Sequence, residues 1–115
     1  MATETAPHTP HAPPAGALVY FDRRELNQIL GLYGRMVSAG HWRDYAIDGL
    51  RDAAVFSVFR RSSEFPLYRI EKRPALARRQ GVWAVLAPGG LVLKRGHDLA
   101  QVLKVFDRAR FAVVD

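Results

Sequence analysis

The 115-residue sequence contains no cysteine. This absence excludes disulfide bonds, thiol catalysis and zinc sites with cysteine ligands. No apolar run approaches the roughly 18 to 20 residues that a membrane-spanning helix requires. The first 16 residues lack the basic start and the apolar stretch of a signal peptide. We therefore expect a cytoplasmic protein without a membrane partner.

Recognisable catalytic motifs are also missing. No G-x-S-x-G pattern surrounds any of the four serines, and the glycines of the APGGL segment lie between two apolar runs instead of between a strand and a helix. His41 and His97 could join Asp44 or Asp98 in a metal or acid–base site, or could serve as residues at element ends. Because no ligand spacing supports a site, we predict no catalytic residue, no metal and no cofactor, and we expect a binding protein instead of an enzyme.

The composition is that of one small globular domain. Hydrophobic residues make up 49% and charged residues 24% of a chain that is long enough for a single core. Residues 1–16 are rich in Pro, Ala and Thr and lack aromatic and branched apolar side chains. Such a segment buries too little surface to offset its ordering entropy. We predict a flexible tail over 1–16 and one domain over 17–115.

Two stretches have helical signals. Asp22 and Glu25 have the spacing of an N-terminal capping box, and Gly40 supplies a stop. Asp98 and Gln101 repeat the capping spacing further along the chain. Apolar residues recur at helical spacing after each start, and they are Leu26, Ile29, Leu30, Tyr33, Met36 and Val37 in the first stretch and Leu99, Val102, Leu103 and Phe106 in the second.

The remaining segments predict strands. These are 17–22, 44–48, 53–61, 67–73, a hairpin formed by 82–87 and 91–95, and 111–114. Asp48-Gly49 indicates a turn, 53–61 is apolar on both faces as in a central strand, and 67–73 alternates as in a half-exposed strand. Short connections favour antiparallel neighbours. The expected fold is α+β, with a mainly antiparallel sheet of about four to six strands and two helices packed on one face.

Positive charge is concentrated in the second half of the chain. The net charge is +6, and the calculated pI is about 10.3. Residues 1–59 hold five Lys/Arg against six acids, whereas residues 60–110 hold twelve against four. Arginine outnumbers lysine eight to three over residues 60–108, which suits forked contacts to phosphate or carboxylate.

These cations are the candidate binding site. If the strands that carry them are neighbours, several should gather at one end of the sheet. The predicted anion-binding or nucleic-acid-binding residues are Arg60, Arg61, Arg69, Lys72, Arg73, Arg78, Arg79, Lys94 and Arg95. Tyr68 and Trp83 could stack on unpaired bases, although Trp83 lies in a strongly apolar strand, where a tryptophan more often belongs to the core.

Three functions remain open at this point. The favoured one is a small basic module that engages RNA or DNA. The alternative is an adaptor that uses an acidic partner surface or an exposed sheet edge, and an enzyme comes third. The basic residues could also form a solvated face with no ligand. Oligomeric state is not indicated by the sequence.

Several segments together resemble a known family. VYFDRRELNQILGLYGRMVSAGHWRDYAID, FSVFRR, PLYRIEKRP and APGGLVLKRGHDLAQVLKVF are similar to a family of small uncharacterised alphaproteobacterial proteins, over about residues 18–114. The resemblance implies a stand-alone cytoplasmic bacterial domain. It supplies no activity and no binding residue.

Overall fold

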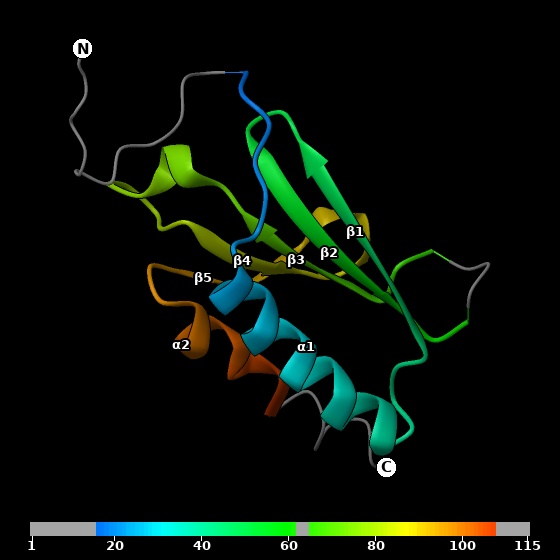
Figure 1. Ribbon diagram of the computed structural model, residues 1–115. Coiled ribbons are helices and arrows are strands. Elements are labelled where there is room, and N and C mark those ends of the chain that lie inside the picture. The colour runs from blue at the N-terminus through cyan, green and yellow to red at the C-terminus, as the bar shows by residue number, and fades with distance from the viewer. Residues whose placement is uncertain (1–15, 62–64, 108–115) are drawn as a thin grey trace.

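The computed structural model describes residues 16–61 and 65–107. Within them the elements are α1 (Arg23–Ser38), β1 (Asp44–Leu50), β2 (Ala53–Phe59), β3 (Tyr68–Lys72), η2 (Pro74–Leu76), β4 (Trp83–Leu86), η3 (Pro88–Gly90), β5 (Val92–Gly96) and α2 (Leu99–Leu103). The strands form one antiparallel sheet in the order β1-β2-β3-β4-β5, and both α-helices lie on one side of it (Figure 1). The predicted α+β class is confirmed. The expected tail over 1–15 and the strand over 111–114 lie outside the described residues.

Helix α1 begins and ends where the sequence predicts. Asp22 Oδ1 accepts the N–H of Glu25 at 2.8 Å, and Glu25 Oε1 accepts the N–H of Asp22 at 2.9 Å, which completes a capping box. At the other end Gly40 has φ +84° and donates its N–H to the Val37 carbonyl, while His41 donates to the Met36 carbonyl. This pair of bonds is a Schellman motif, so the backbone of His41 serves the helix end.

The buried face of α1 differs from the predicted stripe by a small rotation. Ile29, Leu32 and Met36 are buried, whereas Val37 is 40% exposed. Leu32 had not been assigned to the stripe. The covered side of α1 packs on both α2 and the sheet. Periodicity alone cannot fix the rotation of the helix about its axis.

The core lies between the helices and one face of the sheet. Its largest fully buried side chains include Phe56, Phe106, Ile29, Ile70 and Val58. The ring of Phe106 meets the ring of Trp42 edge-on at a centroid distance of 5.0 Å. Burial at Ile29, Val58 and Phe106 agrees with the sequence periodicity, so both helices are held by apolar packing on this face.

Two strand predictions were wrong in their details. Residues 17–22 do not form a strand, because only Leu18 bridges to Arg51 and Val19 N–H bonds to the Leu50 carbonyl. The turn after β1 lies at Arg51-Asp52, where Asp52 has φ +67°, and not at 48–49. Gly49 lies inside β1. The ring of Tyr20 packs against it and leaves no room for a Cβ, which explains why this position is a glycine.

The second predicted capping box does not form. Asp98 precedes α2, but its side chain makes no cap hydrogen bond, and only its carbonyl accepts the Val102 N–H at 3.0 Å. Helix α2 is five residues long and buries Leu99 and Val102. Burial against β4 and β5 therefore holds this helix in place without help from the cap.

Candidate anion-binding face

The second face of the sheet is not packed against either α-helix (Figure 1). Alternate residues such as Phe56, Ile70 and Val85 belong to the core, so their neighbours in sequence point to the other side. We call this other side the open face. By strand register it includes Asp44, Ala46, Asp48 and Leu50 from β1, Ala53, Val55, Ser57 and Phe59 from β2, Arg69 and Glu71 from β3, Ala84 and Leu86 from β4, and Arg95 from β5. The central residues of this face are buried, and they are Val55, Ser57, Glu71, Ala84 and Leu86.

One row across the open face contains a buried carboxylate. Glu71 lies between Val55 and Ala84 on the neighbouring strands and is only 6% exposed. Its Oε1 accepts a hydrogen bond from Arg73 Nε at 3.0 Å, and the Arg73 side chain is 41% exposed. The prediction of a half-exposed strand was therefore wrong at Glu71. Strand β3 is the middle strand of the five, and the ion pair compensates the burial of the charge.

Arg95 lies in the same row, on the far side of Ala84 from Glu71. Its Nη1 atom is buried and has no hydrogen-bond partner among the described residues. A buried donor left unpaired costs about 1 to 3 kcal/mol, and more when it is charged.

Arg69 completes a set of three arginines on the open face. It lies between Ser57 and Leu86 in the next row of the sheet, and no hydrogen bond or ion pair joins its side chain to the described residues. Arg73 is drawn onto the same face by its contact with Glu71. We call Arg69, Arg73 and Arg95 the arginine triad.

The other predicted cations are divided between different places. Arg78 and Arg79 are exposed in the connection after η2, at the end of the sheet where Arg73 lies. Arg60 and Arg61 are exposed beyond the end of β2. Because β2 and β3 are antiparallel, this is the opposite end of the sheet. The expected gathering at one end therefore holds for only part of the set.

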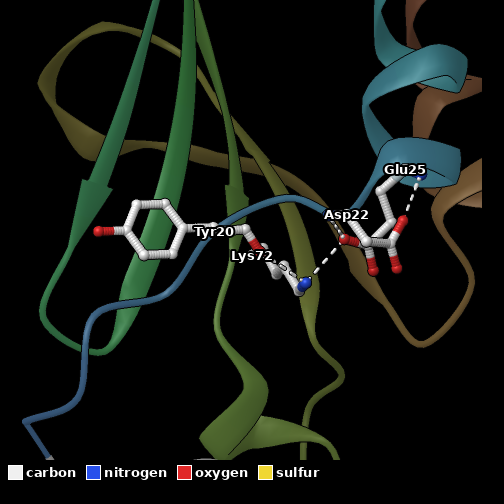
Figure 2. Close-up of polar contacts among 4 residues, drawn as sticks. All are labelled: Tyr20, Asp22, Glu25 and Lys72. Carbon is white, nitrogen blue, oxygen red and sulfur yellow. Dashed lines mark hydrogen bonds and ion pairs between the residues drawn. The ribbon is translucent and has the colours of Figure 1, made fainter.

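Lys72 and Lys94 do not belong to the open face. Lys72 Nζ donates to Glu25 Oε1 at 2.7 Å and to the Tyr20 carbonyl at 2.9 Å, on the helix side of the sheet (Figure 2). Lys94 pairs with Val85, a core residue, and is an exposed residue of the edge strand β5. The sequence could have predicted this outcome. Side chains alternate between the two faces of a strand, so Lys72 and Lys94 point away from the face of Arg69, Arg73 and Arg95.

Negative charge on the open face is confined to β1 and to Glu71. Asp44 and Asp48 are both exposed, and β1 lies at the edge of the sheet opposite to β5. Glu71 is already paired with Arg73. The face therefore has a positive half over β3 to β5 and an acidic edge at β1.

An apolar hollow of about 400 Å³ opens beside Arg69, between the start of β3 and the β4–β5 turn. It is lined by Phe65, Pro66, Tyr68, Arg69, Leu86, Ala87, Pro88 and Gly89. Phe65 is 90% exposed, and the sequence reading did not single it out. The sequence does show a phenylalanine outside any predicted strand, and this could have indicated an exposed aromatic residue.

The two aromatic residues expected to stack on bases pack against core rings, and Tyr68 also lines the hollow beside Arg69. Trp83 is 6% exposed, and its ring stacks on Phe21 at a centroid distance of 6.2 Å. Tyr68 packs its ring against Phe106 at 5.1 Å. Trp83 is therefore a core residue, as its apolar strand indicated, and it is not available for stacking on a base. Sheet register explains the outcome, since both residues belong to the rows that carry the core.

Neither a metal centre nor a transmembrane helix is found in the described ranges. No group of three or more His, Cys, Asp or Glu side chains in 16–61 and 65–107 is arranged to hold a metal ion. Within the same residues, no helix has both the length and the apolar character needed to cross a bilayer.

The fold and the charged face define a small α+β domain with one helix-covered and one open sheet face. Residues 19–103 match the family model described as protein of unknown function DUF2794, and the chain belongs to that family. No curated protein and no solved structure matches the chain.

Proposed function

We propose that this domain binds nucleic acid, RNA or DNA, through the positive half of its open face. The observation that carries the proposal is the arginine triad: Arg69, Arg73 and Arg95 share one sheet face that neither α-helix covers, and only Arg73 has an ion-pair partner among the described residues. A basic bacterial domain of this kind would act in the cytoplasm, as the resemblance to small alphaproteobacterial proteins implies.

Arginine is suited to this role by its chemistry. A guanidinium presents a planar fork of N–H donors that matches the oxygens of a phosphate group. Arg95 is partly exposed and lies in the same row of the sheet as Glu71. Arg78 and Arg79 extend the positive surface beyond the end of β3.

The acidic edge at β1 should determine which part of the open face a bound polyanion covers. A polyanion is repelled by Asp44 and Asp48 on β1 and attracted by the triad on β3 and β5, so its path should follow β3 to β5. Replacing both aspartates by asparagine should tighten binding at low salt. This gain should fade as salt rises, because exposed charges are screened beyond about 10 Å at 0.1 M salt.

Fluorescence anisotropy with a labelled 20-nucleotide strand of mixed sequence, measured over a series of salt concentrations, tests the proposal. Arg69→Ala with Arg95→Ala should weaken binding and reduce the salt slope by about 1.4 to 1.8 units, if each arginine contacts one phosphate. Arg23→Ala with Arg24→Ala is the matched control, since it removes the same charge from exposed positions on α1. Equal losses in the two double variants, or no binding by the unaltered protein, would contradict the proposal.

One observation favours a protein–protein adaptor as the second candidate. Strand β1 is an edge strand, and its Tyr45, Ile47 and Leu50 side chains are 43 to 47% exposed. An unpaired edge can accept a strand from a partner. A pull-down from lysate treated with nuclease separates the two functions, because a stoichiometric complex that survives the treatment and is lost on Ile47→Pro would assign the domain to protein binding.

A further inference from the structure

We propose that the hollow beside Arg69 receives one unpaired base, so that the domain selects single-stranded over duplex nucleic acid. The inference rests on the proposed function and adds to it the form of the ligand. Arg69 and Leu86 are directly opposite each other in the register of β3 and β4, and both line the hollow. The hollow is therefore continuous with the open face that carries the arginine triad.

The lining has the chemistry of a base site. Phe65, Pro66, Leu86 and Pro88 supply apolar surface, and Arg69 is the charged side chain among the described lining residues. A hollow of about 400 Å³ lies within the range of sites for small organic ligands. An apolar hollow next to a phosphate-binding cation fits a nucleotide, which joins a flat ring to an anion.

Tyr68 also lines the hollow, but Phe65 provides the more exposed ring. Its side chain is 90% exposed, whereas Trp83 is buried and the ring of Tyr68 packs on Phe106. An exposed phenylalanine at the mouth of an apolar hollow can cover the face of a base, and any base has such a face. A duplex keeps its bases stacked inside the helix, so only a single strand or a flipped base can reach the site.

Charge favours a nucleic acid over an apolar peptide as the occupant. From Arg69 the open face leads along β3 to Arg73 and across β4 to Arg95. Arg73 comes four residues after Arg69, just beyond the end of β3, which corresponds to about 13 Å at the usual rise per residue of a strand. A chain whose base enters the hollow can thus place its neighbouring phosphates over the triad.

The test compares a labelled 12-nucleotide oligothymidine with the same strand annealed to its complement, by anisotropy at several salt concentrations. Phe65→Ala should weaken binding of the single strand by roughly 5- to 150-fold, the range measured for loss of one base–aromatic stack. The salt slope should stay unchanged, because Phe65 carries no charge, whereas Arg69→Ala should lower it by about one unit. Binding of the duplex should not respond to Phe65→Ala.

Leu91→Ala is the matched control. Leu91 is a 63% exposed apolar residue of the β4–β5 turn that does not line the hollow, so its loss should leave both affinities unchanged. A direct readout comes from a strand carrying 5-iodouracil, which on irradiation should crosslink to Phe65, as located by tandem mass spectrometry.

The outcomes separate the two proposals. Equal affinity for both forms, with no effect of Phe65→Ala, overturns the base site and leaves nucleic-acid binding in place. No binding of either form overturns nucleic-acid binding and the base site together. A third outcome is that no oligonucleotide binds and that Phe65→Ala abolishes a complex with a peptide. This result would assign the hollow to the adaptor function and contradict both nucleic-acid binding and the base site.

Discussion

Lys72 Nζ lies 2.7 Å from Glu25 Oε1, and the same oxygen accepts the backbone N–H of Asp22. The two side chains are only 16% and 19% exposed. One carboxylate therefore closes the capping box of α1 and also ties the end of β3 to that helix (Figure 2). The lysine closest in sequence to the arginine-rich connection has a structural role.

Replacing Lys72 by methionine tests this role. The change keeps the length of the side chain but removes both charged hydrogen bonds, so we expect a loss of about 1 to 3 kcal/mol in the free energy of unfolding, measured by urea denaturation. Nucleic-acid affinity should change little beyond the effect of one unit of net charge. A selective loss of binding, with stability unchanged, would show that Lys72 belongs to the binding surface.

Sequence reasoning located the elements better than it located the surfaces. The capping box at Asp22, the stop at Gly40 and the β4–β5 hairpin all follow from local chemistry, and all are present. The placement of cations depends on strand direction and on alternation relative to the core. Arg69 and Lys72 are three residues apart, so they point to opposite faces of the sheet.

Other features could not be read from the sequence at all. The contact between Lys72 and Glu25 joins residues 47 positions apart, and no local pattern predicts it. The burial of Glu71 requires knowing that β3 has a neighbour on both sides. The hollow beside Phe65 forms only when the β4–β5 turn folds back next to the start of β3.

Arg78 and Arg79 test how far the positive surface extends. Both are exposed in the connection between η2 and β4. If each contacts one phosphate, Arg78→Glu with Arg79→Glu should weaken nucleic-acid binding and flatten its salt dependence by about two units of slope. The fold should be retained, as far-UV circular dichroism will report.

The control is Arg23→Glu with Arg24→Glu, which changes the net charge equally at the start of α1. Acidic residues are favourable at a helix N-terminus, so this variant should be stable. Equal weakening by the two double variants would mean that general basicity is responsible, and that the connection is not part of a site.

Phe106 anchors the C-terminal helical segment in the core. It is 1% exposed, and its ring contacts those of Trp42 and Tyr68. Phe106→Ala should lower the free energy of unfolding by about 3 to 5 kcal/mol, because the cavity it leaves is lined by large rings that cannot collapse into it. Urea denaturation followed by tryptophan fluorescence measures the change. A cost below about 1 kcal/mol would mean that this segment is loosely attached.

Gly81 and Gly89 offer a comparison of two glycines with positive φ. Gly81 has φ +107°, and a Cβ there would collide with the backbone of Gly96, whereas Gly89 has φ +80° and open space around it. We expect Gly89→Ala to cost about 1 to 2 kcal/mol from the left-handed conformation alone. Gly81→Ala should cost clearly more, because β5 must also move.

Thermal unfolding of the two variants measures the difference. Since Gly96 directly follows Arg95, Gly81→Ala should also weaken nucleic-acid binding. Similar melting temperatures for the two variants would refute the close approach of Gly81 to β5.

The consecutive order of the strands has a consequence for how the chain folds. Every strand pairs with the one next to it along the chain, and the first hairpin closes through only two residues. Contacts between consecutive strands join residues that are close in the sequence, so this sheet has a low contact order compared with other sheets of five strands. Refolding should therefore be fast for a domain that contains so much strand. The contact between α1 and α2 is different, because it joins the two ends of the described chain (Figure 1). If the sheet forms first and the helices dock last, Phe106→Ala will accelerate unfolding in stopped-flow experiments and leave the refolding rate almost unchanged.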